Sequence, residues 1–216
     1  MQKVKYAIAV AAFSLAVPAI GQAATVSYTN SDPTPQVQLT VDDAASPGKF
    51  RFSLSTLLGT ADFLGLGFNF AGSMLSNGDL TLVSATGSDD KSIKPVLKLF
   101  GDNTASQSTC GNGCNFNGSG SASDFDYIIR IGGNGGGKNN YVKTVVFDVA
   151  FAGDLSSNPF SQFAFRAQST SNPEGSIKAD LNPEPQPAPV PLPAGLPLLG
   201  SGLLAIGALR RRKRAA

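Results

Sequence analysis

The sequence predicts an all-β fold: a single antiparallel β-sandwich, jelly-roll-like, flanked by a signal peptide and a C-terminal transmembrane helix. Three observations support this prediction. Apolar and polar residues alternate with a period of two across residues 25–181, no sustained helical stripe interrupts them, and Gly, Asn, Ser and Pro separate the alternating segments. Such alternation gives each strand one buried and one solvated face, as is typical of antiparallel sheets. About eight strands are expected.

The first predicted strands follow from apolar sets in the N-terminal half of this body. These sets are Val37, Leu39 and Val41; Phe50, Phe52 and Leu54; Leu64, Leu66, Phe68 and Phe70; and Leu80 and Leu82. Gly65 and Gly67 remove side chains from the other face of the third strand, which predicts a bend or a close packing contact. A later strand containing Leu97 and Leu99 is interrupted at Pro95, which indicates a sheet edge.

A polar segment, residues 101–124, separates the two halves of the body and has Phe116 as its main apolar residue. It contains the chain's two cysteines, Cys110 and Cys114, and we expect them to form a disulfide in an exported protein. A metal or redox pair is the alternative, but no histidine or third cysteine exists to complete a zinc site. Long loops on rigid scaffolds often carry function, so this segment is a candidate binding region.

Three further strands are predicted after this loop, with a Gly-rich turn over residues 132–137. Their apolar sets are Phe125, Tyr127, Ile129 and Ile131; Val145, Phe147, Val149 and Phe151; and Phe163, Phe165 and Ala167. Arg130 and Arg166 point to the opposite, solvated faces of their strands.

Residues 1–24 have the pattern of a secretory signal peptide. Lys3 and Lys5 form the positive region, residues 7–17 form the apolar region, and small residues precede a cleavage site for signal peptidase after Ala23 or Ala24. An uncleaved anchor is the alternative, which the short apolar region and its end at Pro18 disfavour.

The C-terminal end has a linker and then three parts in fixed order. The Pro-rich linker, residues 182–189, is expected to be an extended polyproline II spacer. A pentapeptide, an uncharged apolar run over 192–209 and a basic tail follow within residues 190–216. The run has 18 residues, which as a helix cover about 27 Å, close to the thickness of a bilayer core. The basic tail should stay in the cytoplasm and leave the body on the far side of the membrane.

The pentapeptide is Val190, Pro191, Leu192, Pro193 and Ala194, and the basic tail is Arg210, Arg211, Arg212, Lys213 and Arg214. Together with the Gly-rich apolar run, these residues resemble the PEP-CTERM class of bacterial sorting signals in its VPLPA variant. The resemblance covers about an eighth of the chain. It implies that an exosortase, a membrane-embedded Cys-dependent transpeptidase, recognises the tail and cleaves near the motif. The alternative is an ordinary C-terminal membrane anchor that is never cut.

The same resemblance implies a cellular location and an association. The chain would pass through a transient inner-membrane intermediate and reach the cell surface or extracellular matrix, where proteins of this class are associated with exopolysaccharide or biofilm. In this interpretation the chain is the substrate of the exosortase and has no catalytic role of its own.

Charge and composition limit the chemistry of the body. Residues 25–189 hold ten basic and fifteen acidic groups, so the net positive charge of the whole chain comes from its two ends. An acidic body has no electrostatic surface for nucleic acid. With no histidine in the chain, neither a Ser-His-Asp nor a Cys-His catalytic group can form. We expect no catalytic residues, although a hydrolase that uses aspartates alone is an open alternative.

Two kinds of binding are alternatives for the body. A polysaccharide-binding module would have to use Tyr141 or the polar loops 101–124 and 132–140, since the chain has no Trp and Tyr127 lies in a core register. No cofactor is expected. Structural calcium is an alternative at Asp42 with Asp43, Asp89 with Asp90, or Asp124 with Asp126, but none of these pairs has the spacing of a known calcium loop, so solvated turn residues are the favoured interpretation.

Overall fold

A computed structural model describes residues 24–30, 34–118, 120–133, 141–151, 155 and 159–185. It contains ten strands and one short 3-10 helix, η1 (Asn77–Asp79). The strands are β1 (Thr25–Thr29), β2 (Gln36–Ser46), β3 (Lys49–Leu58), β4 (Asp62–Phe70), β5 (Leu80–Thr86), β6 (Lys98–Phe100), β7 (Tyr127–Arg130), β8 (Thr144–Ala150), β9 (Phe160–Gln168) and β10 (Ser176–Pro183). The predicted all-β class is confirmed.

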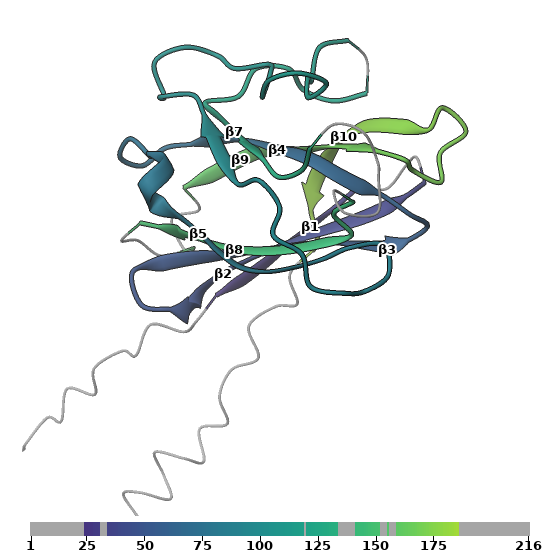
Figure 1. Ribbon diagram of the computed structural model, residues 1–216. Helices are drawn as coiled ribbons and strands as arrows, with labels where there is room; N and C mark the ends of the chain where they lie inside the picture. The colour runs from purple at the N-terminus through teal and green to yellow at the C-terminus, as the bar shows by residue number, and fades with distance from the viewer. Residues whose placement is uncertain are drawn as a thin grey trace, which may run out of the picture.

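The ten strands form one antiparallel sheet in the order β5-β8-β3-β2-β1-β10-β9-β4-β7-β6. Its first half runs from β5 to β1 and its second half from β10 to β6. In the described residues, the halves join where Tyr28 and Thr29 of β1 pair with Pro183 and Asn182 of β10. Figure 1 shows the two halves lying over one another as two layers, which gives the sheet a nearly barrel-like shape.

The core fills the space between these halves and is rich in phenylalanine. Phe52 of β3 is fully buried and its ring lies 5.2 Å from the ring of Phe147 in its own half and 6.1 Å from that of Phe68 across the core. Phe160 and Phe163 of β9 complete the contact from the second half. Inward positions of the predicted strands are therefore the core, as the alternation indicated.

Two residues predicted to face this core face the opposite side of the second half. A register shift in β4 pairs Phe63 with Ala167 and Gly65 with Arg166, so Leu64 is the extra residue of a bulge. Because a bulge changes the alternation, Phe63 enters the core and Leu64 points outward. Phe125 lies before β7 in a bridge with Gln107, outside the regular strand, and it also packs outward.

Two strands were not predicted, and both lie at the junction of the halves. β1 and β10 are edge-to-edge partners there, and Ile177, Ala179 and Leu181 of β10 are buried. β10 ends at Pro183, so the first two residues of the expected linker pair with β1, and the Glu184 N–H donates to the Ser27 carbonyl. At the other end of the second half, β6 is an edge strand, as predicted, but it begins at Lys98, so Pro95 precedes the strand and does not interrupt it.

The predicted targeting segments fall largely outside the described residues. These include Ala23, the pentapeptide at 190–194, the apolar run at 192–209 and the basic tail at 210–214. Ala24 is described, and its backbone N–H donates to Asp43. In the described ranges, no helix is long and apolar enough to cross a membrane.

Candidate functional site

Residues 101–124 lie over the outer face of the second half, where they enclose a second, small hydrophobic core. Phe116 and Phe125 pack edge to face, with ring centres 5.1 Å apart, above Leu64, Ile128 and Ala164 of the sheet. The second core explains why β4 is buried on both faces. A segment that looked like a solvated loop is therefore packed against the sheet.

The two glycines of β4 make this packing possible. A Cβ on Gly65 would lie 2.8 Å from the Cys114 sulfur and 2.9 Å from the Cys110 sulfur, and one on Gly67 would lie 2.7 Å from the Phe125 ring. Real Cβ atoms do not approach other atoms so closely. The close packing contact predicted at these glycines is confirmed.

Cys110 and Cys114 form the expected disulfide, with their Cα atoms 5.1 Å apart. Both are fully buried beneath the loop. The short turn between them is closed by the Cys110 N–H, which donates to the Cys114 carbonyl at 2.9 Å. Arg130 of β7 fixes this turn to the sheet because its Nη1 donates to the carbonyls of Cys110 and Asn112.

The other side of the loop is fixed to β10. The Ala122 N–H donates to Asp180 at 2.8 Å, and the Lys178 ammonium donates to the Asn117 carbonyl. Between these contacts and the β9–β10 turn lies a hollow of about 570 Å³, which we call the loop hollow. Its polar lining residues are Asn115, Arg166, Asn172, Glu174, Ser176 and Lys178.

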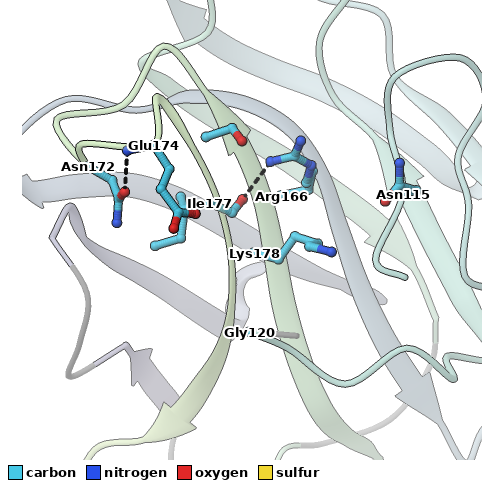
Figure 2. Close-up of a pocket in the computed structure, with 8 residues that line it drawn as sticks. Asn115, Gly120, Arg166, Asn172, Glu174, Ile177 and Lys178 are labelled. Atoms are coloured by element: carbon cyan, nitrogen blue, oxygen red, sulfur yellow. Dashed lines mark hydrogen bonds between the residues drawn. The ribbon is translucent and has the colours of Figure 1, made fainter. Parts of the chain in front are cut away.

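The β9–β10 turn that borders the loop hollow is built by its sequence. Pro173 and Gly175 occupy the positions that a β-turn favours, and Gly175 has a φ of +69°. The Gly175 N–H donates to the Asn172 carbonyl at 2.8 Å, and the Asn172 side chain accepts from the Glu174 N–H. The turn therefore holds Asn172 and Glu174 at the end of the hollow away from Asn115, as Figure 2 shows.

Basic residues cross the outer face of the second half in one row. The cross-strand pairs are Lys98 with Arg130, Arg130 with Gly65, Gly65 with Arg166, and Arg166 with Lys178. We call Lys98, Arg130, Arg166 and Lys178 the basic row. The disulfide lies over Gly65, at the centre of the basic row. Arg166 and Lys178, the members of the row on β9 and β10, line the loop hollow.

Arg166 is held firmly by the backbone around it. Its Nη1 donates to the carbonyls of Ala167 and Ile177, at 2.8 and 3.0 Å, and its Nε is buried with no hydrogen-bond partner. Burial lowers the pKa of Arg166 from its ordinary value, but an arginine keeps its proton in proteins. Figure 2 shows the Arg166 guanidinium bonded to Ile177, and the Lys178 side chain extending toward the side of the hollow where Asn115 lies.

Tyr141 lies at a different place from the loop hollow. It lines a hollow of about 390 Å³ with Thr60, Ser88 and Lys143, which shares no lining residue with the first. Burial and then the negative charge of Asp62 raise the pKa of its phenol, while a hydrogen bond with Thr60 opposes the shift. The predicted polysaccharide contacts, Tyr141 and the 101–124 segment, are therefore not brought together.

The carboxylates considered for calcium mostly accept hydrogen bonds from the protein. Asp42 accepts from the N–H groups of Ala44 and Ala45, Asp43 from those of Ala24 and Leu155, and Asp126 from that of Phe70. Asp89 and Asp90 form ion pairs with Lys91 and Lys143. In the described residues, no three acidic or thiol side chains converge as metal ligands would.

The residues of the candidate site that the sequence did not reveal are Lys178, Glu174 and Asn172. The alternation of Ile177, Ala179 and Leu181 after the Asn-Pro-Glu-Gly turn was the signal that could have identified them, because it predicts a hairpin with Arg166 opposite Lys178. Comparison of the chain with protein families, with curated proteins and with solved structures finds no match.

Proposed function

We propose that this chain is an exported bacterial surface or extracellular-matrix protein, without catalytic activity, whose C-terminal tail is removed by an exosortase. The single observation that carries the proposal is the order of pentapeptide, apolar run and basic tail at 190–216, with a signal peptide at the other end. The body between them would be a noncatalytic β-sandwich domain, with jelly-roll-like character as its expected finer classification.

The arrangement of the described body is compatible with attachment at one place. β10 ends at Pro183 opposite Tyr28, and β1 begins three residues away at Thr25, so the two ends of the described body lie on neighbouring strands at one edge of the domain. The loop hollow lies at the start of β10, where Ser176 lines it. From Ser176 to Pro183, the end of β10 at that edge, a strand spans about 23 Å at roughly 3.3 Å per residue. A domain held at this edge would present the hollow away from its point of attachment.

Mass spectrometry of the mature protein tests the proposal. In cells with an active exosortase, we expect chains that begin near Thr25 and end in or near the pentapeptide. In matched cells whose exosortase lacks its catalytic cysteine, the same chains should keep Ala216. Mature chains that end at Ala216 in both strains would contradict the proposal and leave a permanent anchor as the explanation.

A second candidate function is polysaccharide binding by the body, which the loop hollow favours. Its volume of about 570 Å³ lies in the range of small-molecule sites, and its lining offers amide, hydroxyl, carboxylate and cationic groups. Such groups can bond the hydroxyls of a sugar. Pull-down by the host's own exopolysaccharide, compared with an unrelated neutral polymer, tests this function.

A further inference from the structure

We propose that the loop hollow binds the carboxylate of a uronate-containing polysaccharide, with the Arg166 guanidinium as its main partner and the Lys178 ammonium as its second. This inference rests on the proposed association with polysaccharide and specifies its chemical class. The inference gives a binding role to Arg166 and Lys178, which lie in the body, outside the predicted signal peptide and sorting signal.

The first observation is that two like charges face each other across adjacent strands. Arg166 and Lys178 are direct partners in the β9–β10 register. Like charges in such positions destabilise a sheet. The ion pairs of the described residues join Arg51 to Asp148, Lys91 to Asp89 and Lys143 to Asp90, so neither cation of the hollow takes part in one. An anion bound between the two would remove their repulsion.

The second observation is the way Arg166 is fixed. Both of its protein bonds, to the carbonyls of Ala167 and Ile177, use Nη1. Nε is buried and has no hydrogen-bond partner, and among the described residues no acceptor is bonded to Nη2, which leaves Nη2 as the donor group available to a ligand in the hollow. The two N–H groups of Nη2 can donate charge-assisted hydrogen bonds to a carboxylate. Because the backbone already holds the side chain, little conformational entropy is lost when the anion binds.

The rest of the lining indicates a sugar around that carboxylate. The hollow is much larger than a lone carboxylate, and Asn115 lies at one end while Asn172 and Glu174 lie at the other. Amide groups can donate to and accept from hydroxyls, and the Glu174 carboxylate can accept from them. The Glu174 carboxylate would also repel a ligand with closely spaced negative charges, such as a polyphosphate.

Calorimetric titration of the full chain in detergent micelles tests the inference. The probes are trigalacturonate, its methyl ester and maltotriose, which separate the carboxylate from the sugar. We expect trigalacturonate to bind at least tenfold more tightly than the other two, and more weakly at high salt, because the contact is between charges. Arg166→Gln should weaken trigalacturonate binding at least tenfold. Lys94→Gln, which removes an exposed cation outside the hollow, should not change it.

Other outcomes overturn the inference. These are equal binding of trigalacturonate and its ester, equal binding by Arg166→Gln and Lys94→Gln, tighter binding of a sulfated trisaccharide, or no binding by the unmodified chain. Thermal unfolding checks that each variant folds. If Arg166→Gln does not fold, Lys178→Gln is expected to weaken binding at least threefold, and unchanged binding then overturns the inference.

The two proposals can fail independently. Failure of this site would leave exosortase cleavage at 190–194 intact, while an uncut tail with normal trigalacturonate binding would overturn only the sorting proposal.

Discussion

Gly65 occupies a position where the sheet and the disulfide meet without room for a side chain. An alanine there would place its Cβ less than 3 Å from both sulfurs, which are buried and joined to each other. We expect Gly65→Ala to lower the free energy of unfolding by about 1–3 kcal/mol, measured by urea denaturation, as overpacking generally does.

Gly78 provides a matched control for that substitution. A Cβ there would meet only the Ser76 hydroxyl oxygen at 3.6 Å, which is an ordinary contact. Gly78→Ala should change the free energy of unfolding by no more than about 0.5 kcal/mol. Equal effects of the two substitutions would show that the contact beneath the disulfide is not tight.

Asp62 is a fully buried carboxylate whose oxygens accept from the Val142 N–H and the Gln168 side chain, each at 2.8 Å. Burial raises the pKa of Asp62 above its ordinary value, although these two bonds oppose the shift. The folded state therefore holds this proton more tightly than the unfolded chain. The contribution of Asp62 to stability is greatest below the unfolded pKa and is lost as pH rises through the folded pKa.

Comparison with Asp62→Asn isolates this effect from the other carboxylates. We expect the free energy of unfolding of the unmodified protein, minus that of Asp62→Asn, to fall as pH rises from about 3 to about 7. Urea denaturation at several pH values measures this difference. A difference that grows with pH would mean that the hydrogen bonds outweigh burial and lower the pKa.

At the scale of elements, the 101–124 segment depends on its disulfide and its small core. The bridge closes a loop of only a few residues, which in the chain-entropy estimate contributes about 2 kcal/mol. We expect Cys110→Ser with Cys114→Ser to speed proteolysis within 101–124 while the sheet remains folded. Limited proteolysis followed by mass spectrometry locates the cuts. Faster cutting throughout β1 to β10 would instead mean that the segment supports the whole sheet.

At the scale of the whole molecule, Phe52 joins the two halves of the sheet. Its ring contacts Phe147 within the first half and Phe68, Phe160 and Phe163 across the core. We expect Phe52→Ala to lower the free energy of unfolding by about 3–5 kcal/mol, because a large cavity forms where the halves meet. Val96→Ala, at a side chain that is 53% exposed, should change it by no more than about 0.5 kcal/mol.

The basic tail sets the topology of the whole chain in the proposed sorting route. Replacement of all five residues at 210–214 by Gln should let the C-terminal end cross the membrane, since the positive charges that retain it are gone. We expect more chains that end at Ala216 outside the cell, measured by intact mass. Replacement of the four arginines by Lys keeps the charge and should have no effect. Equal release from both variants would contradict a role for charge.

The sequence by itself determined the strand class and much of the core. Side chains alternate between the two faces of a strand, so sets such as Val37, Leu39 and Val41 identify a buried face without any knowledge of partners. The same local reasoning predicted the bridge between Cys110 and Cys114 and the close contact at Gly65 and Gly67. The targeting signals are also local patterns, and they stay predictions.

Only the tertiary structure decided which strands are neighbours, and with that the candidate site. The bulge at Leu64 and the pairing of β1 with β10 depend on register, which segments distant in sequence set together. In the sequence, Arg166 and Lys178 each have the position of a solvated residue. The β9–β10 register places them opposite each other, and the packed loop forms a hollow around them. A period of two specifies which face a residue occupies and leaves open what lies beside it, because cross-strand neighbours come from contacts that no single segment encodes.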